Sequence, residues 1–337
     1  MTDQPPLLTI DSLSTATGPA RRPQTILEDV SLSIAPGEVV GIVGESGSGK
    51  SMLALSMMNL LPRSIMRIAG TIKLGGTVLT DLSDKAWRDR RGRDMAMIFQ
   101  EPMTSLNPIM RIGQQIEEVL IRRRGMNRRQ ANREALALLE RVEISSPAER
   151  LRAYPHELSG GMRQRVMIAT ALAANARLLI ADEPTTALDV TIQAQILDLL
   201  RQLQAETGMA LILITHDLGV VAEMAQRVMV LYAGRVAELA SVDDIFYCAQ
   251  HPYTKALLAS IPTIDGERER LTTIDGSVPH VGAMPAGCRF ASRCPAARAI
   301  CKTAPPPAMP IARNHNVACL EPFDYELPSS ANQAGAA

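Results

Sequence analysis

A glycine-rich segment near the N-terminus has the residue types and spacing of a phosphate-binding loop. Two glycines five residues apart are followed by Lys and Ser, in the order Gly44, Glu45, Ser46, Gly47, Ser48, Gly49, Lys50, Ser51. Backbone N–H groups of such a loop point at phosphate oxygens, and the following helix adds the positive end of its dipole. Lys50 would bring a mobile charge to the β- and γ-phosphates, and the Ser51 hydroxyl suits Mg²⁺. The segment predicts binding of ATP with Mg²⁺.

Two adjacent acids follow the apolar run Leu178–Ala181. This run is a predicted strand, so Asp182 and Glu183 are expected at the carboxyl edge of a parallel sheet, where α/β proteins bind ligands. Asp182 suits Mg²⁺, held through water, while Glu183 can accept a proton from the attacking water as general base.

Two further polar side chains follow predicted strands in the same way. His216 comes after the run Ala210–Ile214 and can donate a hydrogen bond to the γ-phosphate. Gln100 follows Met95 to Phe99, and its side-chain oxygen can reach Mg²⁺ or the water. Either residue alone would be read as structural or solvated. Their strand-end positions beside the acids favour a catalytic role.

A second anion-binding helix end is predicted at Leu158–Arg165. It contains Ser159, Gly160, Gly161 and Gln164 at the start of a helix that runs to Ala174. One nucleotide has one γ-phosphate, so a second anion site in the same chain makes sense if it closes over ATP held by another copy.

Together these motifs resemble the ATP-binding cassette (ABC) superfamily over about residues 7 to 260. The phosphate loop, Gln100, Ser159 to Gln164, Asp182-Glu183, the stretch Ala187, Leu188, Asp189, and His216 follow the family order. The resemblance implies that two such domains sandwich two ATPs, with Ser159 and Gly161 of one facing the nucleotide of the other and Asp189 across the interface. One departure is the adenine site, because the family stacks adenine on an N-terminal aromatic and Trp87 is the first aromatic here.

Three segments are similar to the ATPases of peptide and nickel importers. They are the stretch from Phe99 to Pro108, the stretch from His251 to Pro262, and a cysteine-containing tail. Some members of that family use these cysteines to hold a [4Fe–4S] cluster, which makes Cys288, Cys294, Cys301 and Cys319 candidate ligands. Four thiolates also suit Zn²⁺, and free thiols are a third option. Cys248, outside the group, is expected to pack in the core.

The resemblance implies an ATP-hydrolysing subunit of an importer for peptides, with nickel or another small solute as the alternative. Its expected partners are a second ATPase subunit, identical or a paralogue, two membrane permease subunits and an extracytoplasmic substrate-binding protein. The expected location is the cytoplasmic face of the membrane. A soluble ABC ATPase for DNA repair or translation is less favoured, since neither a long coiled coil nor a second cassette is present. A redox sensor built on the cysteines is a further alternative.

Strands that alternate with helices must position these groups, which predicts an α/β fold of the P-loop NTPase type. The resemblance adds a parallel-sheet core, an N-terminal antiparallel β patch and a helical subdomain. Expected strands are Leu7–Leu13, Ile26–Ile34, Val39–Val43, a patch around Thr71–Leu79, and two strands within Arg227–Leu239; expected helices are Ser51–Leu61, Ile112–Arg123, Arg128–Val142 and Ile192–Gln204. The expected domains are residues 1–262 for the ATPase, with the helical subdomain at about 105–175, 263–328 for a Cys-rich extension, and 329–337 for a disordered tail.

The composition argues against nucleic acid as a partner and against a membrane-spanning segment. Lys+Arg and Asp+Glu both number 35, so the formal net charge is zero and no global positive field would recruit nucleic acid. No apolar run approaches the roughly 20 residues of a membrane span. The N-terminus lacks the pattern of a secretory signal, so the cysteines are expected to be reduced in the cytoplasm.

Overall fold

The computed structural model describes residues 5–19, 21–101, 105–186, 188–261 and 273–321. The chain divides into two compact units, each assembled from separate stretches. Unit 1 comprises Met1–Leu8, Ser33–Val39 and Lys73–Ile214, and unit 2 comprises Thr9–Leu32, Val40–Ile72 and Thr215–Ala337. Ala187, the parts of the predicted extension before Thr273 and after Glu321, and the predicted tail from 329 lie outside the described residues.

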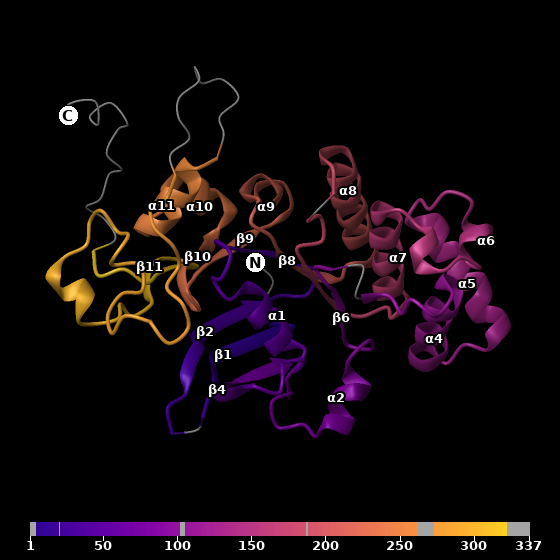
Figure 1. The fold of residues 1–337 in the computed structure, drawn as a ribbon, viewed down its shortest axis with the longest axis horizontal. Coiled ribbons are helices and arrows are strands. Elements are labelled where there is room, and N and C mark those ends of the chain that lie inside the picture. Colours follow the sequence, from indigo (N-terminus) through magenta and orange to yellow (C-terminus); the bar gives the residue numbers. More distant parts are fainter. Residues whose placement is uncertain (1–4, 20, 102–104, 187, 262–272, 322–337) are drawn as a thin grey trace, which may run out of the picture. The chain divides into compact units, whose positions relative to one another are not determined.

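Unit 1 contains a parallel sheet and a group of helices (Figure 1). Its strands β6 (Met95–Ile98), β7 (Leu178–Asp182) and β8 (Ala210–Ile214) pair in that order, and every residue of the three is buried. Continuous apolar strands are expected when both faces of a parallel sheet are covered. The helices of the unit are α2 (Asp84–Arg90), α4 (Ile112–Arg124), α5 (Arg128–Arg141), α6 (Pro147–Arg150), α7 (Gly160–Ala173) and α8 (Val190–Thr207), with a short 3₁₀ turn at Pro155–Glu157.

Helices α4, α5 and α7 pack against one another, in the stretch where a helical subdomain was expected. Asn127 caps α5 by accepting a hydrogen bond from the backbone N–H of Gln130, and Gly125 ends α4 in the left-handed conformation. These are the residue types that stop and start helices most readily.

Unit 2 holds most of the N-terminal β patch and a mixed sheet. The patch has β1 (Leu8–Thr17) between β2 (Gln24–Ile34) and β4 (Ile65–Leu74). The last two residues of β4, Lys73 and Leu74, belong to unit 1, where they pair antiparallel with the short β5 (Thr77–Val78). In the mixed sheet β3 (Val39–Val43) pairs parallel with β9 (Arg227–Tyr232), which continues antiparallel through β10 (Arg235–Ser241), β12 (His315–Val317) and β11 (Met309–Ala312). The remaining elements are α1 (Lys50–Met57), α9 (Leu218–Met224), α10 (Val242–Cys248), α11 (Pro252–Ala259) and a 3₁₀ turn at Ala299–Lys302.

Several predicted boundaries were wrong. Helix α1 ends at Met57 instead of Leu61, because Asn59 adopts a left-handed φ of 49° and the Leu60 N–H turns back to the Leu55 carbonyl. Strand β4 begins at Ile65, six residues before Thr71, in a stretch without apolar alternation. The prediction also lacked α2, α9, α10 and α11 and the two strands of the extension. Cys248, expected in the core, is exposed at the last turn of α10.

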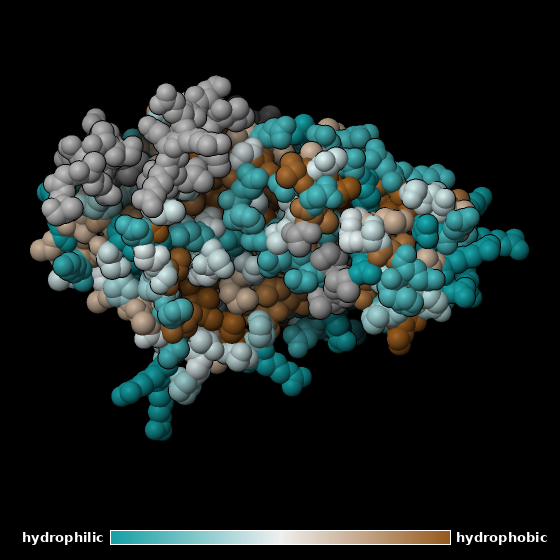
Figure 2. All heavy atoms as spheres, turned by 45° about the horizontal axis from the view of Figure 1, so that its top comes forward, coloured by the Kyte–Doolittle hydropathy of each residue, from teal (hydrophilic) through white to brown (hydrophobic). Residues whose placement is uncertain are grey.

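The distribution of hydrophobic residues on the surface is consistent with the absence of long apolar runs in the sequence. On the face drawn in Figure 2, hydrophilic residues (teal) are interspersed with smaller hydrophobic patches (brown). Among the residues that the structure describes, no helix is both long enough and apolar enough to cross a membrane.

Candidate nucleotide site

The phosphate loop of unit 2 joins the buried strand β3 to helix α1. Gly44 has φ 152° and Gly49 has φ 103°, and a Cβ at Gly44 would lie 2.2 Å from the Leu231 carbonyl oxygen. Only glycine fits such a path without strain. The sequence therefore needs glycine here to bring the loop against β9.

Two features of the loop fit a bound phosphate chain. Helix α1 begins after Gly49 without a side-chain cap, so the positive end of its dipole faces the loop where a phosphate would bind. The Lys50 ammonium is largely buried and donates to the carbonyl oxygens of Gly44 (2.7 Å) and Glu45 (3.1 Å). The lysine is thus folded over the loop itself, where an incoming phosphate would meet it.

In unit 1 the ends of two parallel strands bring Gln100 and Glu183 together. Ile98 of β6 is in register with Ala181 of β7, so the residues after them emerge at the same edge. The Gln100 side-chain amide donates to Glu183 Oε2 at 3.1 Å. Asp182, the last residue of β7, is 4% exposed. Through their hydrogen bond Gln100 and Glu183, the two side chains predicted to act on the attacking water, are in contact.

Glu183 sits on a tightly held backbone. It has φ 47°, a left-handed conformation that is uncommon outside glycine, and its N–H donates to the Ile214 carbonyl at 2.9 Å. A left-handed conformation of this kind persists where the surrounding structure enforces it. The position of Glu183, whose carboxylate is the candidate base, is therefore fixed by its backbone.

Thr186 is a contact of Glu183 that the sequence analysis did not single out. Its hydroxyl donates to Glu183 Oε2 at 2.7 Å, the same oxygen that Gln100 contacts. The backbone turns here, since the Thr186 N–H reaches the Glu183 carbonyl at 3.3 Å. The signal in the sequence was Pro184 followed by two threonines, because proline favours the second position of a turn.

The predicted second anion site is the start of α7. Ser159 is its N-cap and accepts a hydrogen bond from the Met162 N–H, and both Ser159 and Gly160 are exposed. A Cβ at Gly161 would lie 3.1 Å from Ile192, so glycine permits close packing against α8. Gln164 is buried and donates to the Pro184 carbonyl at 2.6 Å, which connects α7 to the turn after Glu183.

Asp189 and His216 each occupy a turn before a helix. Asp189 is exposed and caps α8, accepting from the Ile192 N–H at 2.9 Å. His216, in unit 2, follows Thr215, whose N–H donates to the Ile42 carbonyl of β3 at 3.2 Å, and the histidine is exposed.

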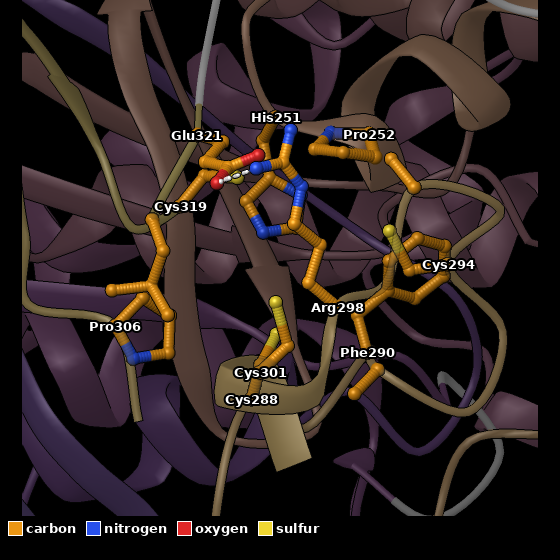
Figure 3. A pocket seen from close by; sticks show the side chains of 13 residues that line it. His251, Pro252, Cys288, Phe290, Cys294, Arg298, Cys301, Pro306, Cys319 and Glu321 are labelled. Atoms are coloured by element: carbon orange, nitrogen blue, oxygen red, sulfur yellow. Dashed lines mark ion pairs between the residues drawn. The ribbon is translucent and has the colours of Figure 1, made fainter. Parts of the chain in front are cut away.

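The four cysteines of the extension line one pocket of about 160 Å³ (Figure 3). Burial raises the pKa of the Cys288 and Cys319 thiols and raises that of Cys294 to about 11, and the neighbouring thiols add to the rise. Among the described residues, however, no three or more His, Cys, Asp or Glu side chains have the arrangement of a metal site. The pocket thus gathers the predicted ligands without forming a coordination geometry.

Known proteins resemble this chain along most of its length. Residues 27–186 match the family described as ABC transporter, and residues 237–301 match the oligopeptide/dipeptide transporter C-terminal region. The oligopeptide transport ATP-binding protein AppD of Bacillus subtilis is 50% identical over 321 residues, covering 95% of this chain and 97% of its own. A putative peptide import ATP-binding protein of Brucella melitensis is 50% identical over 327 residues, covering 94% and 97%.

Solved ABC cassettes share the fold. The dimeric post-hydrolysis state of the cassette MJ0796 bound to ADP and Pi has a TM-score of 0.63 at 29% identity and covers 70% of this chain and 98% of its own. CbiO1 of Clostridium perfringens, part of an ABC transporter complex, has a TM-score of 0.61 at 26% identity and covers 72% and 91%. This chain belongs to the ABC transporter family of ATP-hydrolysing cassettes, in the branch that carries the oligopeptide/dipeptide transporter C-terminal region.

Proposed function

We propose that this protein is the ATP-hydrolysing subunit of a peptide importer. The observation that carries the proposal is the contact of Gln100 with the Glu183 carboxylate at the end of β7, which places a water-positioning amide beside a general base. The two relatives described above are named for oligopeptide transport and peptide import, which favours peptides over nickel as the cargo.

In this proposal the predicted residues divide the work of the site. Residues Gly44 to Lys50 cradle the phosphates, and Ser51 and Asp182 hold Mg²⁺, directly or through water. Gln100 reaches Mg²⁺ or the attacking water with its side-chain oxygen. Glu183 accepts the proton of the attacking water, and His216 donates to the γ-phosphate. Mg²⁺, when bound, neutralises charge that develops on the phosphoryl oxygens.

A second cassette is the expected partner, because Ser159 and Gly160 at the start of α7 are exposed and the N-terminus of a helix favours anions. Ser159, Gly160 and Gly161, with Gln164 behind them and Asp189 nearby on α8, would close over the nucleotide of the other copy. Closure on ATP and reopening after hydrolysis would drive two permease subunits, supplied with peptide by an extracytoplasmic binding protein. The proposed location is the cytoplasmic face of the membrane.

Replacement of Glu183 tests the catalytic assignment. Glu183→Gln keeps the shape of the side chain and removes the base, so ATP turnover should fall at least about 100-fold while ATP binding persists. Glu206→Gln is the matched control, because Glu206 pairs with Arg141 on the surface of unit 1 and should leave turnover unchanged. Retained hydrolysis in the Glu183 variant would refute the assignment.

We further propose that Cys288, Cys294, Cys301 and Cys319 hold a [4Fe–4S] cluster, with Zn²⁺ and free thiols as the alternatives. The donor set fits, since four thiols line one pocket. Burial raises the pKa of Cys288, Cys294 and Cys319, so these three thiols stay protonated unless a cation replaces the protons. Anaerobic purification followed by an absorbance spectrum and metal analysis tests this. A colourless protein that carries zinc would rule out the cluster.

A further inference from the structure

The C-terminal extension contacts the phosphate loop through one arginine. Arg293 NH1 lies 2.7 Å from Glu45 Oε2 and NH2 lies 2.9 Å from Oε1, although the two residues are 248 positions apart. The flat guanidinium matches the carboxylate in a bidentate pair. The Arg293 side chain is only 4% exposed, so solvent ions screen this pair weakly.

Arg293 is itself fixed by other contacts of the extension. Its Nε donates to the Asp275 carbonyl at 2.8 Å, and its NH2 donates to the Ile274 carbonyl at 3.0 Å. NH1 also donates to the Tyr232 hydroxyl at 3.3 Å, and the guanidinium lies over the Phe290 ring. With these donors engaged, the arginine has one well-defined position.

Glu45 is held from three sides. Its carboxylate accepts from Arg293, and its N–H donates to the Tyr253 hydroxyl at 2.8 Å. Its carbonyl oxygen accepts from the Lys50 ammonium at 3.1 Å. One residue therefore links the extension to the lysine of the phosphate loop.

An aromatic cluster supports this arrangement from three segments of the chain. The ring centroids of Tyr232 and Tyr253 are 4.6 Å apart, and Phe290 lies 5.1 Å from the first and 5.3 Å from the second. Only 3% of the residues in the chain are aromatic, yet three of them contact one another here. Their large rings provide rigid packing at this point. The extension cannot move away from the loop without breaking this packing.

We propose that Arg293 is a positioning residue of the nucleotide site. Glu45 places a negative charge within a loop that binds phosphates, and an unpaired carboxylate there would repel the ligand. Arg293 neutralises that charge and holds the Glu45 carboxylate in one position, so the extension sets the affinity of the loop for nucleotide. This inference rests on the proposed ATP-binding role of the loop.

Four full-length proteins test the proposal, with MgADP binding measured by calorimetry: wild type, Glu45→Gln, Arg293→Met and the double variant. Arg293→Met should raise the Kd about tenfold, equivalent to about 1.4 kcal/mol, because Glu45 is left unpaired. The double variant should return to the Kd of Glu45→Gln, since no carboxylate remains to be neutralised. A purely structural role would leave the double variant at least as weak as Arg293→Met, and that result would overturn the proposal.

Further variants distinguish an effect of the Arg293 charge on nucleotide binding from an effect on folding. Arg298→Met removes an arginine of the same extension that pairs with Glu321 and should leave the Kd within twofold of wild type. In turnover assays, Arg293→Met should raise KM more than it lowers kcat. Arg293→Gln, which can still bond the carbonyl oxygens, is made alongside in case methionine prevents folding, and wild-type affinity in it would overturn the proposal. Wild-type protein that binds no MgADP would instead refute the proposed function.

Discussion

The hydroxyl of Thr186 should contribute measurably to catalysis through Glu183. Thr186→Val keeps the shape of the side chain and removes the donor that lies 2.7 Å from Glu183 Oε2. A hydrogen bond to a charged group is worth about 1.5 to 3 kcal/mol, and Thr186 is half-buried, so the lower end applies. The bond lowers the barrier by orienting the base toward the attacking water, so with about 1.4 kcal/mol of that orientation lost, kcat should fall roughly tenfold. Gln100 still contacts the same oxygen, which argues against a larger loss.

Steady-state ATP hydrolysis with a phosphate-release assay measures this effect. KM should change little, because the variant alters neither the phosphate loop nor its lysine. Thr170→Val is the matched control, since its hydroxyl donates to the Val166 carbonyl within α7 at 2.8 Å and does not touch Glu183. Wild-type kcat in Thr186→Val, or an equal loss in Thr170→Val, would refute the reasoning.

Two further predictions concern the loop and the acid stability of unit 2. Gly44→Ala should abolish most MgADP binding and lower the melting temperature by several degrees, because its Cβ would meet the Leu231 carbonyl at 2.2 Å; Gly76→Ala, with φ 80° but nothing within 4 Å, controls for strain alone and should keep binding. The pKa of Glu28 is lowered first by the hydrogen bond from Arg235, so its contribution to stability is present above about pH 4.5 and is lost as the pH falls further. Urea unfolding at pH 6 and pH 3.5 should therefore show a smaller loss in Arg235→Gln than in wild type, and an equal loss would contradict this.

Elements with strong local signals were predicted well. The buried strands β3, β7 and β8 were read from short apolar runs, and α4 and α5 from helical periodicity, with ends within one or two residues. Short helices such as α9 and α10 were missed, because seven residues carry too little periodicity to stand out. The strands of the extension were missed because β12 pairs with β10, which is distant in the sequence, and β11 pairs in turn with β12.

Side-chain environment was harder to foresee. Cys248 was expected to be buried because free cysteine is usually buried, yet it ends a short amphipathic helix on its exposed side. The four other cysteines do line one pocket, which their clustering in the sequence suggested.

The sequence by itself determined which residues are candidates for nucleotide binding and which strands and loops present them. A glycine-lysine-serine loop after an apolar strand, and acids at the end of another, act through spacing of a few residues, so local chemistry suffices to recognise them. Only the tertiary structure decided that Thr186 and Gln100 both donate to the same oxygen of Glu183. The same is true of the ion pair between Glu45 and Arg293, which lie 248 residues apart. Such pairs depend on the packing of segments distant in sequence, which no local pattern encodes.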